Sequence, residues 1–168
     1  MDTIQTLAKK IGWFRLITAT GCFSGYAPIA SGTFGTLAAI PIYLLFVKSG
    51  WMLYLIGTLA IFLIGIQGAN RIEQATQHKD NGIIVIDEIA GYLVTMAFLP
   101  RQWMVIIAGF FIFRFFDIFK PYPIRKLDQN PNLHGFGVMI DDVLAGVYGN
   151  IVLQILVRYV PGFVTSNQ

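Results

Sequence analysis

Long apolar segments dominate this chain and limit what it can fold into. Five of them can be drawn, at residues 33–47, 51–67, 82–99, 103–119 and 142–160. A helix that crosses a bilayer needs about 20 apolar residues, and most of these segments approach that length. Only 12% of the residues are charged, whereas a soluble domain carries about 25%. The pattern therefore predicts a compact, all-α membrane protein with about five apolar spans, and not an unusually apolar soluble helical domain.

The basic residues predict how such a protein is oriented. The 168 residues are enough for one domain, 1–168. If five spans alternate, nine of the twelve Lys and Arg residues share one side: Lys9, Lys10, Arg15, Arg71, Lys79, Arg114, Lys120, Arg125 and Lys126. The other side receives only Lys48, Arg101 and Arg158. Because basic residues concentrate on the cytoplasmic side of membrane proteins, the N-terminus is predicted to be cytoplasmic.

Several other kinds of site are disfavoured. The net charge is only +3 and no basic run is present, so we predict no nucleic-acid surface. Cys22 is the single cysteine, which excludes an intrachain disulfide and disfavours a cysteine metal cluster. The two histidines, His78 and His134, lie in polar connections and are interpreted as loop residues.

Five of the nine acidic residues lie inside or at the edge of apolar segments: Asp87, Glu88, Asp117, Asp141 and Asp142. Carboxylates are costly in hydrocarbon and in packed cores, so they persist there mainly when paired, metal-bound or functional. Five alternating spans place all five at the cytoplasmic ends of three helices. Acids at the start of a helix are ordinary caps. That explanation does not cover Asp117, which is predicted at a helix C-terminus.

Two of the acid-bearing segments share a pattern. In each, an Asp is followed four residues later by Gly, as Asp87–Gly91 and Asp142–Gly146. The small residue lies on the same helix face and lets another helix or a ligand approach closely. Carboxylates without a Cys or His cluster favour Mg²⁺ or Mn²⁺ over Zn²⁺. Adjacent acids on a helix point about 100° apart, so we expect one of each pair to face the metal, with Asp87 and Asp142 preferred.

Two further segments are compatible with a phosphate ligand. Residues 21–36 are rich in Gly, Ser and Thr and lead into an apolar helix, which can present backbone N–H groups to an anion, although an ordinary capped turn explains them equally well. Arg114, Asp117 and Lys120 follow one another at a spacing of three residues. This spacing fits either an ion-pair ladder at the membrane interface or a basic clamp on a phosphate beside a metal.

Four segments together resemble the phosphatidylglycerophosphatase A family of bacterial inner membranes. They are APIASGTFGTLAAIP at 27–41, IVIDEIAGYLV at 84–94, FRFFDIFKPYPI at 113–124 and HGFGVMIDDVLAGVY at 134–148. The resemblance implies a Mg²⁺-dependent, multi-pass enzyme of the inner membrane. Such an enzyme hydrolyses phosphatidylglycerophosphate to phosphatidylglycerol and phosphate at the cytoplasmic face.

The residues supply a hypothesis that is compatible with this resemblance. Four carboxylates are expected to bind Mg²⁺, with Asp117 completing or orienting the site: Asp87, Glu88, Asp141 and Asp142. All five acids are predicted to be catalytic, since a metal lowers the pKa of a bound water and a free carboxylate accepts its proton. Thr33, Arg114 and Lys120 are predicted to bind the substrate's phosphate.

Two rival functions use similar residues. A cation- or proton-coupled transporter also needs buried acids, but near the bilayer midplane and on longer spans. A CDP-alcohol-type phosphotransferase also uses carboxylates and Mg²⁺, but its spaced acidic pattern on a single helix is missing here. The lipid phosphatase is therefore the preferred hypothesis, with the membrane lipids as its surroundings.

Overall fold

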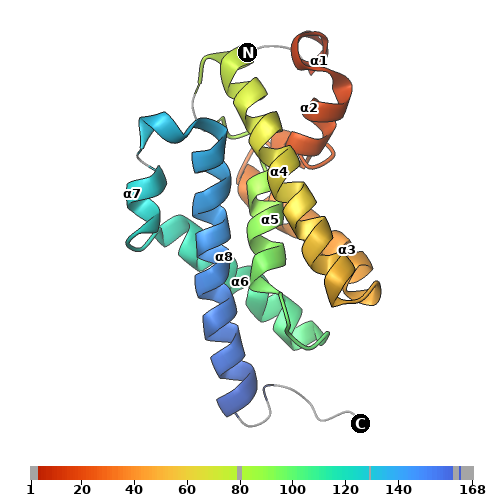
Figure 1. Ribbon diagram of the computed structural model, residues 1–168, viewed down its shortest axis with the longest axis vertical. Coiled ribbons are helices and arrows are strands. Elements are labelled where there is room, and N and C mark those ends of the chain that lie inside the picture. The colour runs from red at the N-terminus through yellow and green to blue at the C-terminus, as the bar shows by residue number, and fades with distance from the viewer. Residues whose placement is uncertain (1–3, 79–80, 129, 161–162, 164–168) are drawn as a thin grey trace.

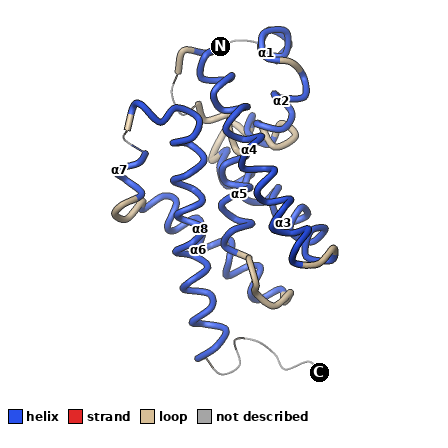
Figure 2. The backbone as a smooth tube through the Cα atoms, viewed as in Figure 1, coloured by secondary structure: helices blue, strands red, loops and turns tan. Residues whose placement is uncertain are grey.

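The computed structural model describes residues 4–78, 81–128, 130–160 and 163, and all regular structure within them is helical (Figures 1 and 2). The elements in chain order are α1 (Ile4–Ile11), α2 (Trp13–Ala19), the 3₁₀ turn η1 (Ser24–Tyr26), α3 (Ser31–Lys48), α4 (Trp51–Thr76), α5 (Ile86–Thr95), α6 (Trp103–Phe119), α7 (Ile124–Asp128), the 3₁₀ turn η2 (Pro131–Leu133) and α8 (His134–Tyr159). The prediction of an all-α protein is confirmed for the described residues.

Three of these helices, α3, α4 and α8, are long and apolar enough to cross a membrane. The predicted segment 82–99 forms only the ten-residue helix α5, which at 1.5 Å per residue is about 15 Å long and does not cross a ~30 Å hydrocarbon core by itself. The segment 103–119 forms α6, of 17 residues. Apolar side chains such as Leu59, Leu63 and Phe111 are more than half exposed on α4 and α6, as expected of a membrane protein.

The last helix begins earlier than predicted. The apolar segment was expected to start at residue 142, but α8 starts at His134 and continues through the acids to Tyr159. Asp141 and Asp142 therefore lie two turns inside the helix, and its first turn contains no acid. Capping of the helix N-terminus does not explain them. Capping remains a possible explanation for Asp87 and Glu88, which lie in the first turn of α5.

The short helix α5 and the long helix α8 pack in parallel, and this is the most extensive contact between helices (Figure 1). Three pairs lie along the contact, each 55 residues apart in the sequence: Asp87 and Asp142, Gly91 and Gly146, Thr95 and Asn150. A Cβ added to Gly146 would lie 2.3 Å from the carbonyl oxygen of Gly91. The two backbones therefore touch, which is the close helix approach that the Asp–Gly pattern predicts.

The other long helices enclose this pair. The helix α3 runs parallel to α5, because Gly32 at its start lies beside Glu88 and Tyr43 further along lies beside Tyr92. The helix α6 runs the opposite way, because Tyr92 donates a hydrogen bond to Ile106 near the start of α6, whereas the acids lie at its end. The helix α4 is also antiparallel to α5. The chain thus changes direction at each successive helix from α3 to α6.

Two clusters of buried apolar residues hold the bundle together. One is formed mainly by α3, α5, α6 and α8 and contains three tyrosines, Tyr43, Tyr54 and Tyr92, whose rings make edge-to-face contacts. The other lies under α1 and α2 against α4 and α8. On α5, Ile86 belongs to the second cluster and Ile89 to the first. The acids between them therefore lie where the two clusters meet.

Candidate active site

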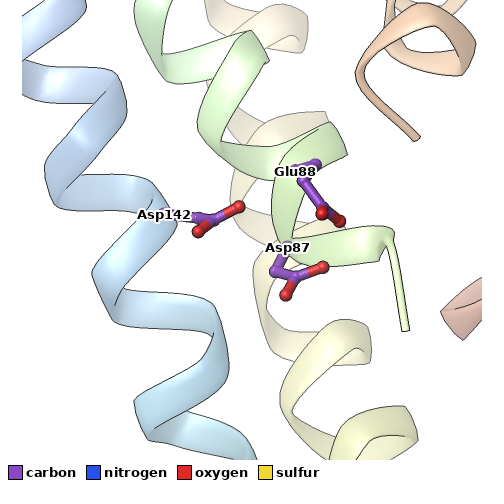
Figure 3. A group of neighbouring side chains, drawn as sticks. All are labelled: Asp87, Glu88 and Asp142. Carbon is purple, nitrogen blue, oxygen red and sulfur yellow. The ribbon is translucent and has the colours of Figure 1, made fainter. Parts of the chain in front are cut away.

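Three acids meet between α5 and α8. Asp87 and Glu88 come from the first turn of α5, and Asp142 points toward them from α8 (Figure 3). One carboxylate oxygen from each lies within 4.8 Å of the others. The close contact of Gly91 with Gly146, one turn further along, fixes this separation because it sets the distance between the two helix axes. Of the adjacent acids on α8, only Asp142 belongs to this group. Both adjacent acids on α5, Asp87 and Glu88, belong to it.

The three acids are removed from water and only partly satisfied by the protein. Asp87 is 7% exposed and Asp142 is 4% exposed. Among the described residues, Glu88 Oε2 and Asp142 Oδ2 are buried oxygens without a hydrogen-bond partner. A buried ionised oxygen with no donor is costly, since it has lost its hydration without replacement. Such oxygens are therefore ready to bind a cation.

Arg114 links the acid group to α6. Its Nη1 lies 3.7 Å from Glu88 Oε1 and also donates to Asp117 Oδ2. Asp117 is buried near the C-terminus of α6, where the helix dipole disfavours a negative charge. The ion pair with Arg114, one turn earlier on the same helix, compensates for that position. Arg114 therefore holds Asp117 in place and presents its charge to the acid group.

Gly32, in the first turn of α3, is a site residue that the sequence analysis did not single out. A Cβ at this position would lie 2.2 Å from Glu88 Oε1 and 2.8 Å from Arg114 Nη1. Any side chain here would displace the pair, so the start of α3 approaches the acid group because residue 32 is glycine. The signal in the sequence was a glycine at the beginning of an apolar helix, within a segment rich in Gly, Ser and Thr.

Lys120 and Asp141 form a second ion pair beside the first group. Lys120 Nζ lies 2.6 Å from Asp141 Oδ2. Lys120 ends α6 in the left-handed region with φ of 43°, which costs about 1 kcal/mol or more for a residue with a Cβ. The backbone turn there brings the side chain back toward α8. Asp141 lies outside the group formed by Asp87, Glu88 and Asp142.

The remaining predicted residues lie at the edge of this arrangement or beyond it. Thr33 directly follows Gly32, and no described contact joins its side chain to the acids. His134 is exposed at the start of α8 and its Nδ1 lies 4.0 Å from Glu73, a buried acid on α4 outside the group. His78 is exposed after α4. Thus the structure brings together the five predicted acids, Arg114 and Lys120.

The donor set fits a hard divalent cation. It consists of carboxylate oxygens only, which is the ligand type that Mg²⁺ and Mn²⁺ prefer. Five carboxylates face two cationic side chains, Arg114 and Lys120, so the fully ionised group has an excess of negative charge. A divalent cation between Glu88 and Asp142 would offset that excess and satisfy their buried oxygens.

Comparisons with known proteins agree on one family. The family model described as phosphatidylglycerophosphatase A matches residues 17–157. A phosphatidylglycerophosphatase A from Escherichia coli (strain K12) is 38% identical over 161 residues, covering 95% of this chain and 92% of the relative. A protein of the same name from Haemophilus influenzae is 40% identical over 149 residues, covering 86% of this chain and 91% of the relative.

A third relative has a different name. This protein from Bacteroides thetaiotaomicron is provisionally named a phosphatidylinositol-3-phosphatase. It is 36% identical over 163 residues, which cover 92% of this chain and 99% of the relative. No solved structure matches the chain. All three relatives are thus named as phosphatases of phosphatidyl lipids.

Proposed function

The chain belongs to the phosphatidylglycerophosphatase A family, and from that premise we propose how its buried acids and bases carry out the reaction. It is a membrane enzyme that removes the terminal phosphate of phosphatidylglycerophosphate, leaving phosphatidylglycerol. One observation carries the assignment of the site: three carboxylates from α5 and α8 meet beside Arg114. Carboxylates that can hold a metal beside a cation that can bind a phosphate suit a metal-assisted phosphatase.

We propose that Asp87, Glu88 and Asp142 hold Mg²⁺. The support is the unpartnered buried oxygens of Glu88 and Asp142 and the all-oxygen donor set. When bound, Mg²⁺ supplies Lewis-acid polarisation of a phosphoryl oxygen and lowers the pKa of a coordinated water. Asp141 and Asp117 orient the site through their ion pairs with Lys120 and Arg114.

The basic side chains bind the phosphoryl group in this proposal. Arg114, already 3.7 Å from Glu88, and Lys120 neutralise the charge that develops on the phosphoryl oxygens. Water attacks phosphorus and gives up a proton to Asp117 or Asp141. The bond between phosphorus and the glycerol oxygen breaks, and that oxygen takes the same proton back from the carboxyl group, which is thereby restored to a carboxylate. Thr33 and the backbone at the start of α3 steady the phosphate, because Gly32 lets this segment approach.

The direction of the helices and the distribution of the basic residues together support a membrane orientation. We propose five passes, in which α3, α4, α6 and α8 cross the bilayer and α5 forms the core of the third pass inside them. The alternation of direction from α3 to α6 supports this, as do eight of the nine basic residues predicted to be cytoplasmic, which it collects at the acid-bearing end. One of the nine, Lys79, lies outside the described residues. That end, with the N-terminus, faces the cytoplasm of a bacterial inner membrane.

A phosphate-release assay tests the proposal. The protein is purified in neutral detergent and given phosphatidylglycerophosphate, phosphatidic acid or phosphatidylinositol 3-phosphate in mixed micelles. We expect release from phosphatidylglycerophosphate, loss of release with EDTA, and recovery when Mg²⁺ is added in excess. The third lipid is included because one relative is named for it.

Each alternative outcome contradicts a different part of the proposal. Full activity in EDTA would contradict the metal-assisted mechanism. Faster hydrolysis of another lipid phosphate would contradict the proposal that phosphatidylglycerophosphate is the preferred substrate. No phosphate release from any lipid, together with cation uptake into vesicles that contain the protein, would favour the transporter.

A further inference from the structure

We propose that a basic cavity beside the acid group binds the second phosphate of the substrate and thereby selects phosphatidylglycerophosphate over lipids that carry a single phosphate. The inference rests on the proposed function and deepens it. The substrate carries two phosphates, a terminal monoester that is hydrolysed and an internal diester that joins the glycerol to the diacylglycerol. The proposed reaction above uses Arg114 and Lys120 on the monoester and leaves the diester without a binding site.

The basic cavity lies at the turn from α6 into α7. It has a volume of about 730 Å³ and is lined by Phe119, Lys120, Pro121, Tyr122, Arg125 and Lys126. Arg125 and Lys126 project from the short helix α7, which is anchored by the fully buried Ile124. Among the described residues, neither of these two cations has a carboxylate partner. A cavity with this lining attracts an anion, and guanidinium and ammonium groups suit a phosphate.

Lys120 joins the basic cavity to the acid group. Its ammonium lies 2.6 Å from Asp141, the neighbour of Asp142 in α8, and Lys120 is also one of the residues that line the basic cavity. Lys120 therefore lies between the acid group and the basic cavity. A ligand with two phosphates linked by a short glycerol can place one phosphate at each.

An apolar groove continues from the basic cavity on the other side. It has a volume of about 280 Å³ and shares Pro121 and Tyr122 with the basic cavity. Its remaining lining is Phe116 of α6 with Tyr148, Ile151 and Val152 of α8. It follows α8 away from the acids toward the apolar part of the bundle, which is where the acyl chains of a membrane lipid lie.

The three sites follow the order of chemical groups along the lipid. The acid group is followed by the basic cavity and then by the apolar groove. In phosphatidylglycerophosphate the monoester phosphate is followed by the glycerol, the diester phosphate and the acyl chains. Phosphatidic acid lacks the diester, so its single phosphate cannot occupy the acid group and the basic cavity together. Arg125 and Lys126 are therefore assigned to substrate selection, not to the chemical step.

The test is a comparison of two substrates in one detergent. The kcat/KM values for phosphatidylglycerophosphate and phosphatidic acid are measured in neutral mixed micelles without other anionic lipid, for the native chain and for Arg125→Gln, Lys126→Gln and the double variant. Losing charge-assisted hydrogen bonds should lower the ratio of the two values by about tenfold or more in the double variant, mainly through KM. Phosphatidic acid hydrolysis should be unchanged.

A matched control is Arg71→Gln, which removes an exposed cation from α4 at the same end of the bundle. It should leave the ratio unchanged. A second variant, Ile151→Trp, fills the apolar groove and should raise KM for both lipids without changing the ratio or the hydrolysis of soluble glycerol 3-phosphate. Circular dichroism checks that each variant is folded. If the double variant does not fold, the two single variants, each at an exposed residue, still test the inference.

Two results would overturn the inference while leaving the proposed function in place. An unchanged ratio in the folded double variant would show that the diester does not bind the basic cavity. An equal loss for both lipids would show that Arg125 and Lys126 only attract anionic surfaces. The proposed function is tested separately, by phosphate release from phosphatidylglycerophosphate by the native chain with and without EDTA.

Discussion

The two halves of the α5–α8 pair treat their buried polar groups differently. In the second half, Asn150 donates to the carbonyl oxygens of Thr95 and Ala97, at 2.9 and 2.8 Å, where α5 ends. In the first half, Glu88 and Asp142 each keep a buried oxygen without a hydrogen-bond partner among the described residues. The helix packing is continuous through both halves. The polar groups of one half are satisfied within the fold, whereas the unpartnered oxygens of the other half belong to the proposed metal site.

The largest effect is expected when a site acid is neutralised without a change in size. Asp142→Asn should lower phosphate release by about 100-fold or more, the scale on which loss of a charge-stabilising group acts. The variant should unfold at the same temperature as the native chain or higher, because it also removes repulsion from Asp87 and Glu88. Release assays and thermal unfolding followed by circular dichroism check both expectations.

The control for this variant is Glu73→Gln. Glu73 is also a buried acid, but it lies on α4 beside His134 and outside the acid group. It should retain activity. If Asp142→Asn were as active as Glu73→Gln, the assignment of the acid group to catalysis would be wrong.

A smaller effect, on stability and activity together, is expected at the helix contact between the two halves. In Gly146→Ala the new Cβ would meet the carbonyl oxygen of Gly91 at 2.3 Å, so the helices must move apart at a cost of about 3 kcal/mol. Movement there also displaces Asp142 from Asp87, and activity should fall. The free energy of unfolding in detergent and the rate of release are measured on the same sample.

Gly82→Ala is the matched control for that contact. A Cβ at Gly82 would have its nearest neighbour, Ser31 Oγ, at 3.8 Å, an ordinary contact. Its free energy of unfolding should change by less than about 0.5 kcal/mol. Equal destabilisation by both substitutions would contradict the close approach of α5 and α8.

The smallest effect is expected in the half that stabilises the fold. Asn150→Ala removes the donors to two carbonyl oxygens at the end of α5 and should lower the free energy of unfolding by about 1–2 kcal/mol. Activity per folded molecule should be unchanged, because Asn150 lies two turns from Asp142. A strong loss of activity with intact stability would show that the two halves are not separate in function.

The sequence predicted the helical class and the approximate positions of the long helices, because apolar composition and length determine both. It could not predict that residues 82–99 form only a ten-residue helix. Most of their apolar side chains are buried between other helices, and a buried short helix has the same composition as one that spans a membrane. The start of α8 was also missed, since residues 134–141 contain glycines and an acid that reduce the apolar signal although they are helical.

The same limits apply to the candidate site. The five acids were recognisable because carboxylates are rare in apolar segments, and the Asp–Gly pattern indicated a close contact before its partner was known. The partners themselves depend on tertiary packing. Spacing along α6 allowed Lys120 to pair with Asp117, but only the turn after Phe119 brings it to Asp141. The contact of Gly32 with Glu88 and Arg114 likewise joins three helices that no local pattern relates.

The parallel packing of α5 against α8 also bears on how the protein is made. The helix α5 is synthesised well before α8, so Asp87 and Glu88 enter the membrane region without Asp142 opposite them. The third carboxylate of the group, Asp142, and the amide that caps the end of α5, Asn150, both come from the last long helix. Nascent chains that end before α8 lack Asp142, so under the proposed mechanism we expect them to leave the surrounding lipids unhydrolysed.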